Sequence, residues 1–133
     1  MKLHHVQVSC PSGAEPEARR FYAEGLGLVE VDKPAALAGR GGAWFRGLDE
    51  HGSVTAEIHV GVEPEFVPAR KAHPALVLAS VAELEACAVR LEALGFEVDW
   101  SERTTFDGFE RFHTHDGSGN RVEIMVSAVS PGL

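Results

Sequence analysis

The segment SGAEPEARRFYAEGLG (residues 12–27) decides the fold, because the chain repeats it as SVAELEACAVRLEALG (residues 80–95). When the first segment is laid over the second, eight of the sixteen positions are identical. Each copy opens with a serine that a glutamate follows three residues later, which is the capping box of a helix N-terminus. Each copy closes on Leu-Gly, a typical helix end. The sequence therefore predicts two equivalent helices inside a duplicated unit.

Short strand patterns surround both predicted helices in the same order. Residues 3–9 (LHHVQVS) and 73–79 (HPALVLA) precede the helices as strands. Further strands are predicted at 28–32, 42–47 and 54–61, and again at 96–100, 109–115 and 121–127. We therefore predict an α+β fold in a single domain over residues 1–133, made of module 1 (about 3–61), a linker (62–71) and module 2 (about 72–127).

One βαβββ module is too small to bury a core alone. Two paired modules, from one chain or from two chains, are predicted to form a curved mixed sheet around a cavity. The incomplete sheet in each module also predicts a homodimer.

Composition excludes several classes of function. The formal net charge of −8 argues against binding to nucleic acid, which requires clustered cations. The apolar stretches are too short to span a membrane. The first ten residues, MKLHHVQVSC, contain no apolar signal-peptide core. Cys10 and Cys87 lie in unrelated contexts and are predicted to be free thiols, so a cytoplasmic location is expected.

The repeat also aligns candidate metal ligands. The offset that places Ser12 on Ser80 also places His5 on His73, and an offset smaller by two places Glu57-Ile58 on Glu123-Ile124. Period-two alternation turns these four side chains away from the helices. We therefore predict that His5, Glu57, His73 and Glu123 bind one divalent metal ion, such as Zn, Ni, Co, Mn or Fe(II). The alternative is that both histidines are polar strand positions kept only by ancestry.

Other side chains share the predicted inner face. His59 lies two residues after Glu57 and is either a ligand in its place or a proton-transfer group; the repeat favours Glu57. Two further pairs flank predicted core phenylalanines and are candidates for substrate binding: Trp44 with Arg46, and Arg111 with His113. The remaining histidines, His4, His51 and His115, are expected in solvent.

The openings LHHVQ (3–7) and AHPAL (72–76) and the closing DGSGNRVEIM (116–125) resemble the vicinal oxygen chelate superfamily. That superfamily contains glyoxalase, bleomycin-resistance and extradiol dioxygenase proteins. The resemblance covers about residues 3 to 127 and implies metal ligands on the first and fourth strands of each module, here His5, Glu57, His73 and Glu123.

The resemblance also implies the chemistry. It implies a small-molecule lyase or isomerase that acts through a metal-stabilised enolate or enediolate, with Glu57 or Glu123 as the base at a pKa raised by burial. A small dioxygenase is one alternative. The other is a protein of the bleomycin-resistance type that sequesters a small molecule without turnover.

Overall fold

The computed structural model describes residues 1–129 and contains two four-stranded mixed sheets. Sheet A has the strand order β1-β4-β3-β2, and sheet B has the order β5-β8-β7-β6. In each sheet the first strand pairs in parallel with the fourth, and the remaining pairs are antiparallel. This confirms the predicted α+β fold with two βαβββ units.

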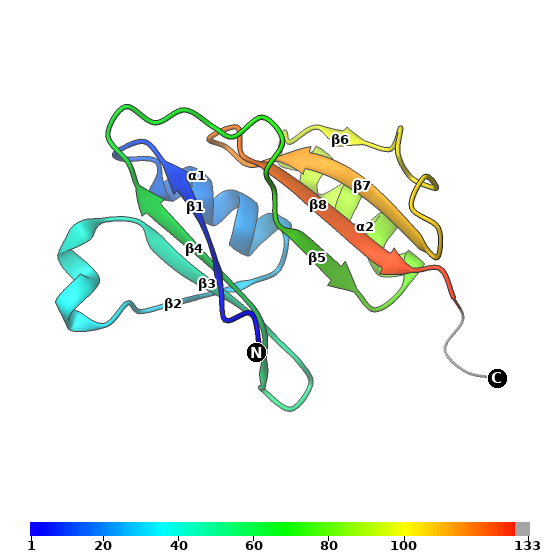
Figure 1. Ribbon diagram of the computed structural model, residues 1–133, viewed down its shortest axis with the longest axis horizontal. Helices are drawn as coiled ribbons and strands as arrows, with labels where there is room; N and C mark the ends of the chain where they lie inside the picture. Colours follow the sequence, from blue (N-terminus) through cyan, green and yellow to red (C-terminus); the bar gives the residue numbers. More distant parts are fainter. Residues whose placement is uncertain (130–133) are drawn as a thin grey trace.

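The first unit contains β1 (Val6–Cys10), α1 (Glu15–Ala18), the π-helix η1 (Arg19–Gly25), β2 (Val29–Val31), the 3-10 helix η2 (Ala35–Arg40), β3 (Ala43–Leu48) and β4 (Val54–Val62). The second contains β5 (Ala75–Leu78), α2 (Val81–Ala93), β6 (Val98–Asp99), β7 (Phe109–His115) and β8 (Arg121–Ser127). The two sheets lie side by side with α1 and α2 behind them (Figure 1).

Only the second of the two predicted capping boxes forms. The Ser80 hydroxyl accepts a hydrogen bond from the Glu83 backbone N–H at 3.1 Å. In the first copy the N-cap is Ala14, and no side chain caps the helix. The Glu15 carboxylate instead accepts from the backbone N–H of Gly42 at 3.0 Å, so it ties the helix start to the chain before β3.

The core lies between the helices and the sheets. Phe21 and Tyr22 of η1 are fully buried, and the Tyr22 ring stacks on Phe45 of β3. Gly25 lets η1 approach α2 closely, because a Cβ there would lie 2.5 Å from a Leu91 methyl carbon. Ile58 and Val60 of β4 and Ile124 and Val126 of β8 belong to the same core, as the predicted alternation requires.

A buried polar network joins the two units. The Tyr22 hydroxyl donates to the Asp116 carboxylate at 2.7 Å. Asn120 donates through its side-chain amide both to Asp116 and to the Ser9 carbonyl of β1. Burial and the Asp116 carboxylate raise the pKa of Tyr22, so the phenol stays protonated. Hydrogen bonds made by the DGSGN turn (residues 116–120) thus link β1 and η1 of the first unit to the second unit.

The two cysteines, Cys10 and Cys87, are buried free thiols, and burial raises the pKa of each.

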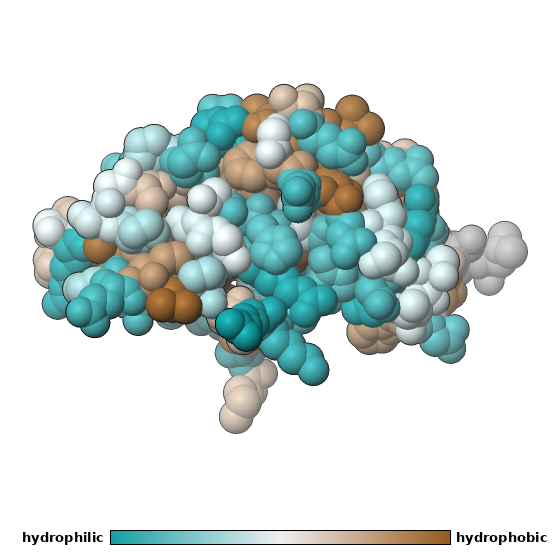
Figure 2. Space-filling model, turned by 90° about the horizontal axis from the view of Figure 1, so that it is seen from above, coloured by the Kyte–Doolittle hydropathy of each residue, from teal (hydrophilic) through white to brown (hydrophobic). Residues whose placement is uncertain are grey.

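None of the helices within residues 1–129 is long and apolar enough to cross a membrane. In the view from above (Figure 2), hydrophobic side chains form small patches among hydrophilic ones.

Candidate metal centre

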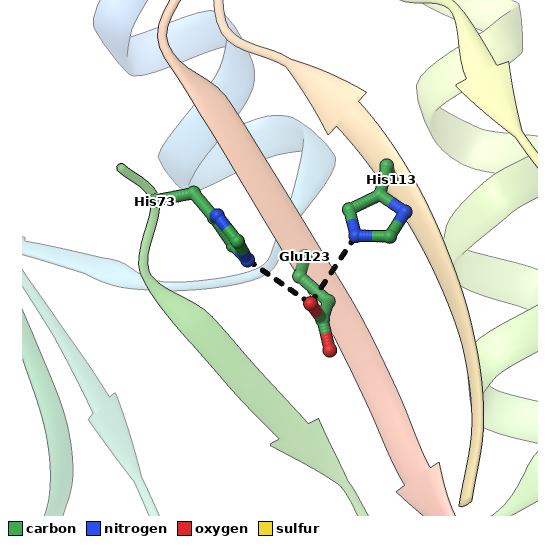
Figure 3. A group of neighbouring side chains, drawn as sticks. All are labelled: His73, His113 and Glu123. Carbon is green, nitrogen blue, oxygen red and sulfur yellow. Dashed lines mark hydrogen bonds and ion pairs between the residues drawn. The ribbon is translucent and has the colours of Figure 1, made fainter. Parts of the chain in front are cut away.

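Three side chains of the second unit converge at the face of sheet B that points away from the helices. His73 precedes β5, His113 lies on β7 and Glu123 lies on β8. The two Nε2 atoms lie 3.1 Å and 3.2 Å from the same carboxylate oxygen, Glu123 Oε1. Figure 3 shows the two imidazoles approaching this carboxylate from either side. Among the described residues, this is the one group of three whose ligand atoms all lie within 4.8 Å of one another.

Strand pairing explains this convergence. His113 and Glu123 are register partners across the antiparallel β7–β8 pair, so their side chains are neighbours on one face. The Glu123 backbone N–H donates to the Pro74 carbonyl, which fixes the turn that carries His73 beside β8.

The hydrogen bonding of His73 fits a cation at this position. His73 Nδ1 lies 2.7 Å from the Lys71 carbonyl oxygen, which can only accept, so Nδ1 carries the hydrogen. The Nε2 of a neutral His73 therefore points a lone pair at Glu123 Oε1. Two lone pairs at that distance repel each other unless a proton or a metal ion neutralises them. A ligand histidine whose other N–H donates to a backbone carbonyl is a common arrangement in metal sites.

The charges around the triad keep its donors in their metal-binding forms. Burial acts to raise the pKa of Glu123, but the hydrogen bond that His73 donates when a proton occupies its Nε2, together with the Arg111 charge, outweighs burial, and the pKa lies below its ordinary value. Burial, followed by the charge of Arg121, lowers the pKa of His113. An ionised carboxylate and a neutral imidazole are the forms that bind metal.

Sheet A carries a different cluster at the corresponding place. Trp44 stacks on His59 with ring centroids 3.8 Å apart, and His59 stacks on His5 at 4.0 Å. Arg46 donates to the Glu57 carboxylate at 2.5 Å, and His4 Nδ1 lies 3.3 Å from the other oxygen of that carboxylate. The first unit therefore contains a stack of three aromatic rings beside an ion pair.

The carboxylate of this ion pair is ionised. Burial acts to raise the pKa of Glu57, but the Arg46 guanidinium outweighs it and the pKa lies below its ordinary value. For both Glu57 and Glu123, the expectation of a pKa raised by burial is therefore wrong, because each carboxylate lies against a cation.

The pairing register corrects the equivalence of Glu57 and Glu123. Gln7 pairs with His59, whereas Ala75, which the repeat places on Gln7, pairs with Glu123. The pairing of the third strand in each unit, β3 and β7, supports the same correction. The partner of Trp44 is Val31, and the partner of His113 is Asp99, which the same offset places on Val31.

Through the helices, the first strands and the second strands, the repeat therefore keeps the offset that places Ser12 on Ser80. Because these strands pair with β3 and β4 in one unit and with β7 and β8 in the other, the pairing makes His59 the structural counterpart of Glu123 and Trp44 the counterpart of His113. The smaller offset, which matched Glu57 to Glu123, fails because the β3–β4 hairpin is longer. Fifteen positions separate the register partners Trp44 and His59, against ten for His113 and Glu123.

The predicted ligands divide between the two clusters. His73 and Glu123 come together, whereas His5 and Glu57 belong to the cluster of sheet A and not to the compact triad. A cavity of about 450 Å³ nevertheless has His5, Glu57 and His73 in its lining. His113 and Arg111, both predicted to bind substrate, lie at the triad: His113 is one of its three members, and Arg111 Nη1 donates to Glu123 Oε1 at 3.3 Å.

The remaining histidines separate into two groups. His51 and His115 are exposed, as expected, whereas the largely exposed His4 contacts both His5 and Glu57. The alternation pattern of the first strand does not predict these contacts of His4, because His4 precedes the first residue of β1.

The chain belongs to the Glyoxalase/Bleomycin resistance protein/Dioxygenase superfamily, whose family model matches residues 2–124. Among solved structures, the chain is similar to a protein assigned to the glyoxalase family from Bacillus anthracis. The two are 38% identical with a TM-score of 0.81, and the match covers 96% of this chain and 95% of that one.

Two more distant structures show the same fold. The fosfomycin resistance protein FosX from Listeria monocytogenes is 16% identical with a TM-score of 0.69, over 97% of this chain and 95% of that one. TnmS3, an antibiotic binding protein from Streptomyces sp. CB03234, is 21% identical with a TM-score of 0.63, over 96% and 99%. No curated protein matches the chain.

Proposed function

We propose that this protein is a divalent-metal-dependent lyase or isomerase of the glyoxalase type, acting on a small molecule with oxygens on adjacent carbons. His73, His113 and Glu123 would hold the ion. The observation that carries the proposal is the approach of both imidazole Nε2 atoms to one carboxylate oxygen at 3.1 Å and 3.2 Å, with His73 Nδ1 committed to the Lys71 carbonyl. Superfamily membership supports it.

Three protein ligands leave coordination positions open, so a bound ion would polarise a substrate oxygen and stabilise negative charge that develops on it. The protein supplies the orientation. The Lys71 carbonyl fixes the His73 ring, and the β7–β8 register holds His113 beside Glu123. Because strands hold both His113 and Glu123, their geometry is set before substrate arrives.

Glu57 is the proton acceptor that we propose for the reaction. It lines the same cavity as His73; Arg46 pairs with its Oε1, so its Oε2 is the oxygen that would take the proton. His59, the other candidate in sheet A, is covered by Trp44 on one ring face and by His5 on the other. Its Nε2 atom is buried, so a substrate in the cavity has no direct access to it.

A small dioxygenase is the second candidate function, because two histidines and one carboxylate with open positions form the triad of non-haem Fe(II) oxygenases. Loading with Fe(II) under anaerobic conditions separates the two functions. Oxygen uptake with a catechol supports the dioxygenase. Oxygen-independent turnover of an α-hydroxycarbonyl with Ni, Co or Zn supports the isomerase. Tight ligand binding by metal-free protein without turnover supports sequestration instead.

The ligand assignment is tested by metal titration of three alanine variants followed by elemental analysis. Wild-type protein is expected to bind about one divalent ion per chain. His113→Ala removes one of three donors and should weaken binding by about 100-fold or more, whereas His51→Ala, in an exposed turn, should bind as wild type does. If His5→Ala loses the ion while His113→Ala keeps it, the predicted set of His5, Glu57, His73 and Glu123 replaces the triad.

We also propose a homodimer in a reducing, cytoplasmic environment. Within residues 1–129, β1 and β5 are edge strands that face each other across the gap between the two sheets without pairing (Figure 1), and Leu48, Val54 and Val77 are exposed hydrophobic residues. Cys10 and Cys87 remain free thiols. Light scattering tests the assembly: a species of 14.3 kDa, the mass of one chain, contradicts it.

A further inference from the structure

Arg111 lies beside the triad, and four groups outside the triad contact its guanidinium, one of them the Glu102 carboxylate, which lies 3.7 Å from Nη2. Arg111 Nε donates to the Glu102 carbonyl at 3.2 Å, and Nη2 donates to the Thr105 hydroxyl at 2.8 Å. The Phe106 ring lies 5.5 Å from the guanidinium carbon. The β6–β7 loop therefore fixes the position of Arg111 whether or not Glu123 accepts from it.

The remaining nitrogen, Nη1, donates to Glu123 Oε1 at 3.3 Å, the same oxygen that both imidazoles approach. An ion bound by the triad would take lone-pair density from this oxygen. Arg111 Nη1 would then lose its acceptor, whereas Nε and Nη2 would keep theirs. The Arg111 side chain is 16% exposed, so part of it can be reached from solvent.

Resting on the proposed function, we propose that Arg111 is the anion-binding residue of the site and that metal loading redirects it from Glu123 to the ligand. The ligand class is a small oxyanion, a carboxylate or a phosphonate, with a hydroxyl on the adjacent carbon. A guanidinium fixed by a loop suits this task, because its N–H groups match the oxygens of both kinds of anion.

A second consequence concerns the ion itself. In metal-free protein, Arg111 competes with the ion for Glu123 Oε1 and places a positive charge beside it. Removal of this charge should tighten metal binding. The proposal thus predicts two opposite effects of Arg111→Met, tighter metal binding and weaker anion binding. A purely structural role of Arg111 would not produce this combination.

The experiment is isothermal titration of full-length protein, first with nickel and then with three ligands that share a CH2OH group: neutral hydroxyacetone, glycolate and hydroxymethylphosphonate. We expect nickel-loaded wild type to prefer at least one anion over hydroxyacetone by about tenfold or more, the equivalent of one charge-assisted hydrogen bond. Metal-free protein should lack this preference. The anion that binds more tightly identifies the source of the oxyanion, and equal binding assigns the recognition to charge alone.

Arg111→Met should lose the preference while binding nickel several-fold more tightly. Arg103→Met is the matched control, because Arg103 lies in the β6–β7 loop that contacts Arg111 but pairs with Glu85 and Glu110. Arg111→Lys keeps the positive charge but not the planar guanidinium, so it should retain part of the anion preference. It replaces Arg111→Met as the test variant if the methionine variant proves unstable. If wild type binds nickel but Arg111→Met keeps the anion preference or binds nickel more weakly, this inference is wrong and the proposed function stands. If wild type binds no metal, both fail.

Discussion

Replacing Tyr22 by phenylalanine tests whether the DGSGN turn stabilises the fold rather than forming part of the functional site. The substitution removes one oxygen from a fully buried ring and leaves the stacking on Phe45 in place. The lost interaction is the 2.7 Å hydrogen bond from the phenol to the Asp116 carboxylate.

The magnitude follows from the partners that remain. A buried hydrogen bond to a charged group contributes about 1.5–3 kcal/mol. Asp116 Oδ2 still accepts from the Asn120 amide at 2.9 Å, so the carboxylate is not left unpaired. We therefore expect a loss in the lower part of that range, about 1.5–2 kcal/mol. For 133 residues, this corresponds to a fall in Tm of about 5–7 °C.

Urea denaturation of metal-free protein gives the free energy of unfolding, and a double-mutant cycle isolates the contact. In an Asp116→Ala background, Tyr22→Phe should cost much less than in wild type, because its acceptor is gone. Metal affinity should not change, since Tyr22 lies on the helix side of the sheets. The reasoning is refuted if the single variant weakens the metal site, or if it loses less than about 0.5 kcal/mol, the low end for an ordinary neutral hydrogen bond.

Two further predictions concern the cluster on sheet A. Burial, together with the nearby His5, lowers the pKa of His59, so the unfolded chain binds a proton more readily than the folded protein. Stability of the metal-free protein should fall as the pH drops through 6.5, and His59→Gln should flatten the plot of Tm against pH between 7.5 and 5; an unchanged slope contradicts this. The register equivalence is tested by the double substitution Trp44→His with His59→Glu, which should raise the metal content from about one ion per chain to about two, whereas Trp44→His alone should leave it unchanged.

The sequence predicts the fold well because its strongest signal is local. The repeated helix segment, the alternation in the strands and the turn residues all act over a few positions, and the two βαβββ units follow from them. The Ser12 capping box fails for a reason outside the segment. Glu15 finds a partner in Gly42, which lies far along the chain, and nothing in the helix sequence indicates that contact.

The site is predicted only in part, because it depends on register across hairpins. Alternation places Arg111, His113 and Glu123 on the polar face, but only strand pairing shows that His113 lies directly opposite Glu123. The local match of Glu57-Ile58 to Glu123-Ile124 is misleading. The hairpin before β4 is five positions longer than the hairpin before β8, and the β3–β4 pair also has a register irregularity at Gly47 and Leu48.

The corrected register gives a physical reason why the second unit alone carries a compact metal triad within the described part of the chain. At the position of Glu123, sheet A has His59, which cannot supply a negative charge, and at the position of His113 it has Trp44, which has no metal-binding atom. The nearest carboxylate, Glu57, is already neutralised by Arg46. Sheet A therefore lacks a free anionic ligand. In sheet B the cation beside the carboxylate, Arg111, has other partners in the β6–β7 loop and makes only a 3.3 Å contact with Glu123. In the proposed function the two units therefore have different roles: sheet B would hold the ion, and sheet A contributes His5 and Glu57 to the wall of the cavity that His73 shares.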